Sequence, residues 1–186
     1  MNFYRILADP AATTRWYLKS PTDLHGIEVD PRIFTQGLCV NSLQPLNLPL
    51  RRPGYEVDFN FCDFDMVVTP AVINVELERL VGEVIQRIPV QINGSSNKYE
   101  ILNICNLVQC IDESKSMYTK WTDSDGRPEK IGEYRMIAKI SIDPLAANGH
   151  HIFRLSGWPI ALIISEEVKS LLETRKVSGI KYEHVS

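Results

Sequence analysis

Hydrophobic positions along the chain follow two periods, one typical of strands and one typical of helices. Apolar residues at spacings of three and four predict two helices, one over about residues 70–87 and one that begins after Ser165 and ends before Gly179. Short alternating or continuously apolar runs predict strands at residues 3–7, 16–18, 56–68, 90–92, 99–110, 134–142, 150–155, 160–164 and 180–184. This order of elements predicts an α+β fold with an antiparallel or mixed sheet and two main helices.

Three positions refine this pattern. We expect Thr69 to be the N-cap of the first helix, with a first-turn proline after it, and Ser165 to be the N-cap of the second. Within residues 56–68 the apolar positions change face near Cys62. This change predicts a bulge or bend within one long strand, because a strand keeps its faces unless a residue is inserted.

Prolines concentrate in the N-terminal third. Six of the 11 prolines precede residue 60, and such a segment does not hold a continuous helix or a central strand. We therefore expect residues 1–69 to form an irregular, proline-rich part with short strands, and residues 70–186 to form an α+β domain. We expect the two to make one continuous globular unit, although the pattern leaves open whether the first part is a lobe of its own.

The charge and the apolar runs argue against two classes of partner. With 20 Lys and Arg against 23 Asp and Glu, the formal net charge is −3, and no basic block is present to neutralise a phosphate backbone. The longest strongly apolar run, residues 159–164, is far shorter than the roughly 20 residues that span a bilayer. Residues 1–10 lack the apolar core of a secretory signal. We expect a cytoplasmic protein that binds neither nucleic acid nor membrane.

The four cysteines, Cys39, Cys62, Cys105 and Cys110, have no spacing typical of a metal site. There is no CxxC pair and no neighbouring histidine ligand set. In a reducing compartment this predicts four thiols in or near the core rather than metal ligands.

Motifs of catalysis and cofactor binding are missing from the sequence. No serine has the GxSxG surroundings of a hydrolase nucleophile, and neither GxGxxG nor GxxxxGK[ST] occurs. His150 and His151 are adjacent on a predicted strand, so their side chains point to opposite faces and cannot share one ion. We predict no enzyme activity, no cofactor and no metal, with a cysteine and a histidine brought together by the fold as the remaining catalytic alternative.

One group of carboxylates offers a different function. Asp58, Asp63 and Asp65 are close enough in sequence to supply oxygen ligands to a hard cation, which would make this a small metal-dependent or ligand-binding protein. We favour the alternative that they lie on the solvated face of a strand, because the change of face near Cys62 would separate Asp58 from the other two.

A long polar segment carries the signal for partner binding. Residues 112–133 are rich in charged residues and serine, yet they include large apolar side chains. Trp and Tyr bury a large area at small entropic cost, so exposed aromatics in such a loop would anchor a partner. We predict an acidic, aromatic-bearing partner surface made of Tyr118, Trp121, Asp123 and Asp125. The alternative is that Tyr118 and Trp121 fold back onto the sheet and cover the core.

A series of short motifs resembles a known bacterial family: the immunity-protein domain of polymorphic toxin systems, first described in myxobacteria. The resemblance covers about residue 70 to the end of the chain, and it depends on the order and spacing of the motifs. They are Pro70-Ala71-Val72, Ile88-Pro89-Val90, Tyr99-Glu100-Ile101-Leu102-Asn103, Ile111-Asp112, Ile152-Phe153-Arg154-Leu155, Ile163-Ile164-Ser165 and Ser178-Gly179-Ile180-Lys181-Tyr182.

The resemblance implies a cytoplasmic protein that binds and neutralises a toxin encoded beside it, by stoichiometric inhibition without an active site. The shared residues would be structural, with Asn103 and Arg154 in buried polar contacts, Phe153 and Ile164 in the core, and Gly179 at a helix stop. A homodimer, or a homo-oligomeric structural module, is the alternative to toxin binding that the sequence leaves open.

Overall fold

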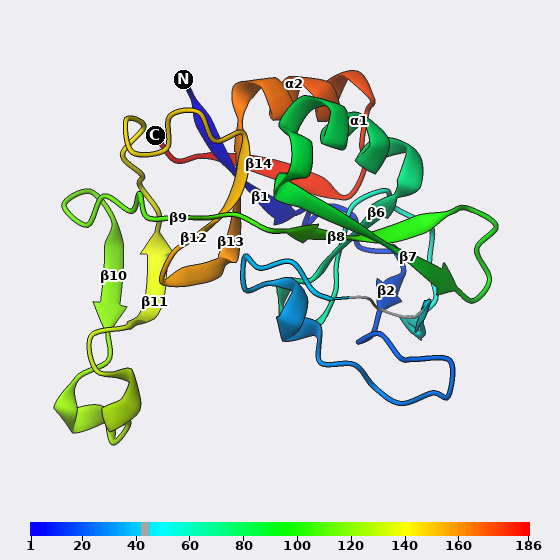
Figure 1. The fold of residues 1–186 in the computed structure, drawn as a ribbon, viewed down its shortest axis with the longest axis horizontal. Coiled ribbons are helices and arrows are strands. Elements are labelled where there is room, and N and C mark those ends of the chain that lie inside the picture. The colour runs from blue at the N-terminus through cyan, green and yellow to red at the C-terminus, as the bar shows by residue number, and fades with distance from the viewer. Residues whose placement is uncertain (42–44) are drawn as a thin grey trace.

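Two five-stranded sheets carry most of the chain (Figure 1). The structure is a computed structural model that describes residues 1–41 and 45–186; residues 42–44, within the predicted irregular part, lie outside the described residues. Strands of both orientations and two α-helices make this an α+β fold, as predicted. Within the described residues, no helix has both the length and the hydropathy needed to cross a membrane.

The first sheet joins the two ends of the chain. Its order is β14 (Ile180–His184), β1 (Phe3–Ala8), β13 (Trp158–Ser165), β12 (Ile152–Leu155) and β9 (Leu107–Val108). β1 is antiparallel to both of its neighbours, whereas β9 runs parallel to β12. The N-terminal strand is therefore held between two C-terminal strands.

The second sheet is built around the hairpin of β7 (Ile85–Ile92) and β8 (Tyr99–Ile104). β3 (Leu46–Leu48) pairs in parallel with β7 on one side, while β6 (Val67–Pro70) and β5 (Asn60–Phe61) follow β8 on the other. A two-stranded sheet of β2 (Tyr17–Leu18) and β4 (Leu50–Arg52) lies beside it. Strands from residues 1–69 thus pair with later strands in both large sheets; the division at residue 69 stays a prediction.

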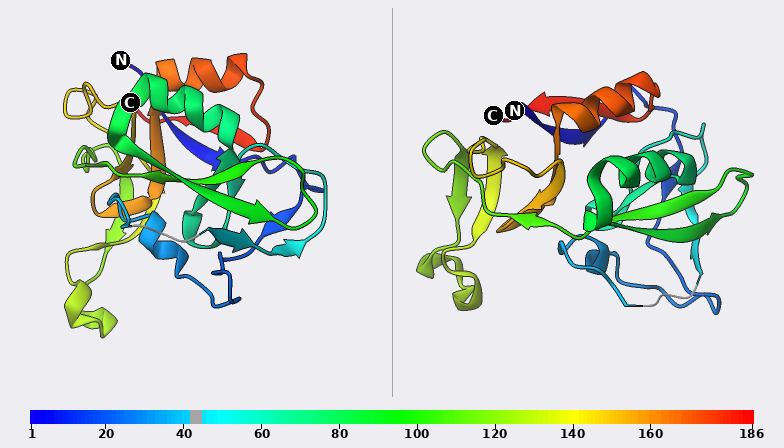
Figure 2. Two further views of the ribbon diagram at one scale, coloured as in Figure 1. Left: turned by 45° about the vertical axis from the view of Figure 1, so that its right-hand side comes forward. Right: turned by 45° about the horizontal axis from the view of Figure 1, so that its top comes forward.

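The helices α1 (Ala71–Val81) and α2 (Glu166–Thr174) lie side by side, as the views in Figures 1 and 2 agree. The Nη2 atom of Arg175 lies 2.6 Å from Oε1 of Glu76 and links the two helices at the surface. A core cluster contains apolar residues of both helices and both large sheets, including Ile6, Leu77 and Leu102. This shared core joins the sheets into one packed body.

The predicted N-cap of the second helix is confirmed, whereas the predicted N-cap and end of the first helix are wrong. The Oγ of Ser165 accepts a hydrogen bond from the backbone N of Val168. α1, however, has Pro70 rather than Thr69 at its N-cap position, without a side-chain capping hydrogen bond, and it ends at Val81 rather than near residue 87. Gly82 stops it by adopting a φ of 71°, a value that favours glycine, after which a short 3₁₀ turn leads into β7.

The predicted bulged strand at residues 56–68 is wrong. β5 and β6 are antiparallel partners, joined by the 3₁₀ turn Asp63–Asp65, in which Phe64 and Asp65 have φ values of 56° and 58°. The change of face near Cys62 therefore reflects a reversal of the chain, because a tight turn exchanges the inward and outward positions just as a bulge does.

The prediction of four free thiols is also wrong. Cys39 and Cys105 form a disulfide, with their Cα atoms 5.1 Å apart, whereas Cys62 and Cys110 are free. The fold brings together two residues separated by 66 positions, which no local spacing in the sequence signals.

Candidate partner-binding surface

A hairpin formed by β10 (Met117–Lys120) and β11 (Tyr134–Lys139) projects from the side of the first sheet. We call residues 112–139 the arm. Figures 1 and 2 show its tip, with the 3₁₀ turns Asp123–Asp125 and Pro128–Lys130, pointing away from the large sheets. At its base Ile111 and Ile142 form a bridge, and the backbone N of Asp112 donates to the carbonyl of Ser141 at 2.9 Å.

The inner face of the arm packs against the body. The rings of Tyr118 and Tyr134 meet edge to face with centroids 5.4 Å apart, and both pack on the core cluster that contains Phe153 and Ile163. Tyr118 is therefore part of the arm's attachment. This corresponds to the alternative in which an aromatic side chain folds back onto the core.

Glu113 ties these aromatics together at the base of the arm. Its carboxylate accepts hydrogen bonds from the Tyr118 hydroxyl at 2.9 Å and the Tyr134 hydroxyl at 2.6 Å, and Lys120 Nζ lies 2.7 Å away. These hydrogen bonds, that of Lys120 first, lower the pKa of Glu113 to about 2. Glu113, Lys120 and Tyr134 also line a cleft of about 430 Å³ between the arm and Ser156-Gly157, the turn between β12 and β13.

The tip of the arm is held by polar contacts around Trp121. The Arg135 guanidinium lies 4.9 Å and Lys130 Nζ 5.5 Å from the centre of the indole ring. Asp125 accepts from the backbone N of Thr122 and forms an ion pair with Arg135; the hydrogen bond from the Thr122 backbone is the main cause of the lowered pKa of Asp125. The half-buried indole is thus kept in a defined position at the surface.

The outer face of the arm exposes large apolar side chains. Met117 is 63% exposed, Met136 51% and Ile131 48%. Along β10 and β11, Met117 and Met136 alternate with the inward-facing Tyr118 and Ile137, as the period of a strand requires. Exposed apolar residues clustered on one projecting element mark an interaction surface more often than scattered ones do.

The four predicted partner residues have different surroundings. Trp121, Asp123 and Asp125 come together at the tip, whereas Tyr118 lies nearer the base. Asp125 has partners within the arm, whereas the Asp123 side chain has no hydrogen bond or ion pair within the part of the chain that the structure describes. The predicted segment 112–133 contains six Asp and Glu against four Lys and Arg, and Arg135 and Lys139 on β11 bring the whole arm to six of each.

Sequence reasoning missed Met136, Ile131 and Glu113. Ile131 lies within the predicted polar segment but was not singled out, and Met136 follows that segment and was taken as part of a strand. Its exposure follows from the pairing of the hairpin, in which Met136 lies opposite the exposed Thr119 of β10. Glu113 has no sequence signal, because its three donors meet it only in the folded arm.

The three aspartates of the metal alternative do not form one site. Asp58 accepts from the backbone N and the hydroxyl of Ser178, and Asp63 pairs with Arg51 at 2.7 Å. Among residues 1–41 and 45–186, no group of three or more His, Cys, Asp or Glu side chains could hold a metal ion. Asp65 takes part only through its backbone carbonyl, which accepts from Arg154, and the geometry gives no support to a cation site.

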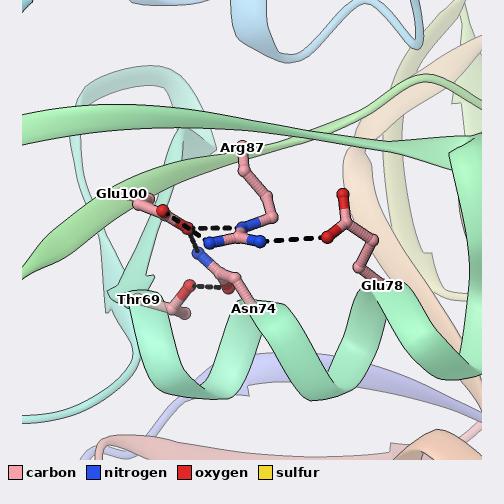
Figure 3. A network of polar contacts seen from close by, with 5 residues as sticks. All are labelled: Thr69, Asn74, Glu78, Arg87 and Glu100. Carbon is pink, nitrogen blue, oxygen red and sulfur yellow. Dashed lines mark hydrogen bonds and ion pairs between the residues drawn. The ribbon is translucent and has the colours of Figure 1, made fainter.

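A network of polar side chains, which includes the buried Thr69, Asn74 and Glu100, lies between α1 and the second sheet (Figure 3). Arg87 on β7 donates from Nε and Nη2 to the two oxygens of Glu100 on β8, both at 2.9 Å, and Nη1 donates to Glu78 on α1 at 2.9 Å. Asn74 donates to Glu100 and accepts from Thr69. The hydrogen bond to Glu100 is the main cause of the raised pKa of Arg87. This network pairs its charges internally, which suits a structural link.

Two residues shared with the suspected family make buried polar contacts, as the resemblance implied. Arg154 is fully buried and donates to the carbonyls of Pro159 at 2.7 Å and Asp65 at 3.0 Å; burial lowers its pKa to about 10. Asn103 is equally buried and donates to the carbonyl of Leu38. Phe153 and Ile164 are core residues, whereas Gly179, with a φ of 89°, stands directly before β14 and after the helix has ended.

The fold and this surface define an α+β protein with a projecting arm and with an internally paired charge network between α1 and the second sheet. Residues 89–186, just over half of the chain, match the family model described as Immunity protein family (Imm11). The chain therefore belongs to this family, and the predicted resemblance to an immunity protein is confirmed. Family membership indicates a general role in immunity to a toxin. No curated protein was found to match the chain.

Proposed function

We propose that this protein is a bacterial immunity protein of a polymorphic toxin system, which binds its cognate toxin one to one in the cytoplasm and blocks it without a catalytic step. Membership of the immunity family supports a toxin as the partner. The observation that carries the choice of surface is the exposure of Met117, Ile131 and Met136 on the arm, which lies within the part of the chain that matches the family.

The arm has features that favour tight association. Methionine side chains adapt to a partner's shape, and Met117 and Met136 are carried by the antiparallel strands β10 and β11. Trp121 is already positioned by Arg135 and Lys130, so little further ordering would be required on binding. Anchors of this kind slow dissociation.

The predicted surface residues take two roles in this proposal. Trp121 and Asp123 would contact the toxin, because one is a partly exposed aromatic and the other a free carboxylate at the tip. Tyr118 and Asp125 would act indirectly, since they hold the base and the tip of the arm in shape. The mixed charges of the arm would orient the toxin during encounter and contribute less to the lifetime of the complex.

Protection of cells tests the proposal. The chain is produced together with the toxin encoded beside it, either as wild type, as Trp121→Ala combined with Met136→Asp, or as the matched control Tyr55→Ala. Tyr55 is an exposed aromatic of the N-terminal part, outside the arm. We expect growth with the wild type and Tyr55→Ala but not with the arm variant, while all three keep the same thermal midpoint.

Titration with purified proteins separates binding from catalysis. We expect toxin activity to disappear at a molar ratio of about one, because each immunity molecule would occupy one toxin. Full inactivation far below that ratio would show catalytic removal of the toxin and contradict the proposal. Protection by the arm variant equal to that by the wild type, or a mass that shows the arm buried in a homo-oligomer, would also contradict it.

A further inference from the structure

The disulfide joins an N-terminal segment to the point where the chain changes sheets. Cys105 directly follows β8 of the second sheet, and Leu107 begins β9 of the first. Cys39 belongs to residues 35–41, which follow the 3₁₀ helix Pro31–Phe34. We call residues 35–41 the strap. The bond thus fastens the strap to the crossover between the two large sheets.

Several noncovalent contacts hold the strap in the same place. The Gln86 side chain donates to the carbonyl of Val40 at 2.8 Å and accepts from its backbone N at 3.0 Å. The Asn103 amide donates to the carbonyl of Leu38 at 3.0 Å, and Gly37 packs so closely on the Leu107 side chain that no Cβ would fit. These contacts keep Cys39 opposite Cys105 independently of the bond, so a reduced pair would remain at high effective concentration.

Cys39 of the bonded pair is more accessible than either free thiol, since Cys62 is half-buried and Cys110 is buried. Cys39 is exposed and Cys105 half-buried. Cys110, by contrast, is buried, and burial raises the pKa of its thiol to about 12; burial also raises the pKa of Cys62. Exposed disulfides exchange with thiols readily, whereas thiols with raised pKa values react slowly. Thiol–disulfide exchange should therefore occur at the Cys39–Cys105 pair before the other two cysteines react.

We propose that Cys39 and Cys105 form a reversible thiol–disulfide switch, which fastens the strap to the sheet crossover when oxidised and lets the strap open more often when reduced by a dithiol. In a reducing compartment, protein disulfides are mostly transient and redox-sensing. The switch is a property of the fold beyond toxin binding, and it can exist whether or not the arm binds a toxin.

The exchange is balanced as an ordinary dithiol reaction. A thiolate of the reductant attacks Sγ of the exposed Cys39, the Cys39–Cys105 bond breaks, and Cys105 leaves as a thiolate that takes up a proton. The second thiol of the reductant then attacks the mixed disulfide and releases Cys39 as a thiol. The protein gains two electrons and two protons, and the dithiol becomes a disulfide.

Wild-type protein equilibrated in buffers of reduced and oxidised dithiothreitol tests the switch directly. Thiols are counted by alkylation and mass spectrometry after denaturation, and the strap is probed by chymotrypsin, which can cleave after the exposed Leu38. We expect two alkylated cysteines in oxidising buffer and four in reducing buffer, with reversal on reoxidation. Cleavage after Leu38 should increase by about tenfold or more on reduction, since the strap opens locally more often.

Two variants complete the test. Cys110→Ala should keep the full redox response, because its thiol is outside the pair. In every buffer, chymotrypsin should cleave Cys39→Ser after Leu38 as fast as it cleaves the reduced wild type. The proposal is overturned if four thiols are found in all buffers, if the native bond cannot be reduced without unfolding, or if reduction leaves cleavage after Leu38 unchanged. The wild-type chain is compared with itself in oxidising and reducing buffer. The test therefore still decides the question if Cys39→Ser fails to fold.

Discussion

Replacing Arg87 by methionine removes the central cation of the network in Figure 3. Both guanidinium hydrogen bonds to Glu100 and the one to Glu78 are lost, while the length of an unbranched side chain is largely kept. Glu100 is only 7% exposed and would keep Asn74 as its remaining side-chain donor. A carboxylate would then be left buried without a counter-charge between α1 and the second sheet.

The expected cost follows from this burial. Removing one partner of a buried ion pair destabilises proteins by about 3–5 kcal/mol. The Arg87 side chain is 24% exposed, so water reaches part of the site and the lower end of that range applies. We therefore expect Arg87→Met to lower the free energy of unfolding by about 3 kcal/mol. Adding Glu100→Gln should recover part of this loss, because the isolated charge disappears.

Urea unfolding at 25 °C measures the effect, with Arg51→Met as the matched control. Arg51 pairs with Asp63 at 2.7 Å, but its side chain is 56% exposed, so the loss there should stay below about 1 kcal/mol. If Arg87→Met costs no more than Arg51→Met, the network does not stabilise the junction of α1 with the sheet. The reasoning from burial would then be refuted.

Two further predictions concern the arm and a tight turn. The pKa of Glu113 is lowered to about 2, below the ordinary value of about 4.3. Its ionised form therefore stabilises the fold above about pH 4.3, and this stabilisation is lost as the pH falls through about 2. The thermal midpoint of Glu113→Gln should therefore lie below that of the wild type at pH 7 and approach it near pH 2; a gap that does not change with pH would contradict this. Gly179→Ala should lower the free energy of unfolding in urea by at least about 1 kcal/mol more than Gly149→Ala does. Both glycines have a positive φ, but only at Gly179 would the added Cβ lie 2.7 Å from the carbonyl oxygen of Phe59. Equal losses would show that backbone conformation alone matters.

Local patterns predicted the elements that depend on local interactions. The α+β class and the start of α2 at Ser165 follow from periodicity and capping, which act over a few residues. The end of α1 was misplaced because apolar spacing continues to Val84, whereas the backbone of Gly82 already ends the helix. In this helix the glycine determines where the helix ends, although the apolar spacing continues beyond it.

Features that depend on distant pairing were not predictable from the pattern. β1 lies between strands more than 150 positions away, and the Cys39–Cys105 bond spans 66 positions. The reversal at Phe64 was mistaken for a bulge because both exchange the faces of a strand. In the arm, the charged residues and Trp121 indicated a surface segment, but the inward direction of Tyr118 depends on Tyr134 and the core behind it.

Hydrogen–deuterium exchange with and without the toxin tests the central claim most directly, because it maps the bound surface on the wild-type chain. The toxin encoded beside this protein is added at a molar ratio of one, and amide exchange is followed along residues 1–186. We predict slower exchange across residues 117–136 of the arm and little change at residues 50–55, which belong to the N-terminal part outside the arm. Complex formation with unchanged exchange in the arm, or slowing confined to another surface, would contradict the account.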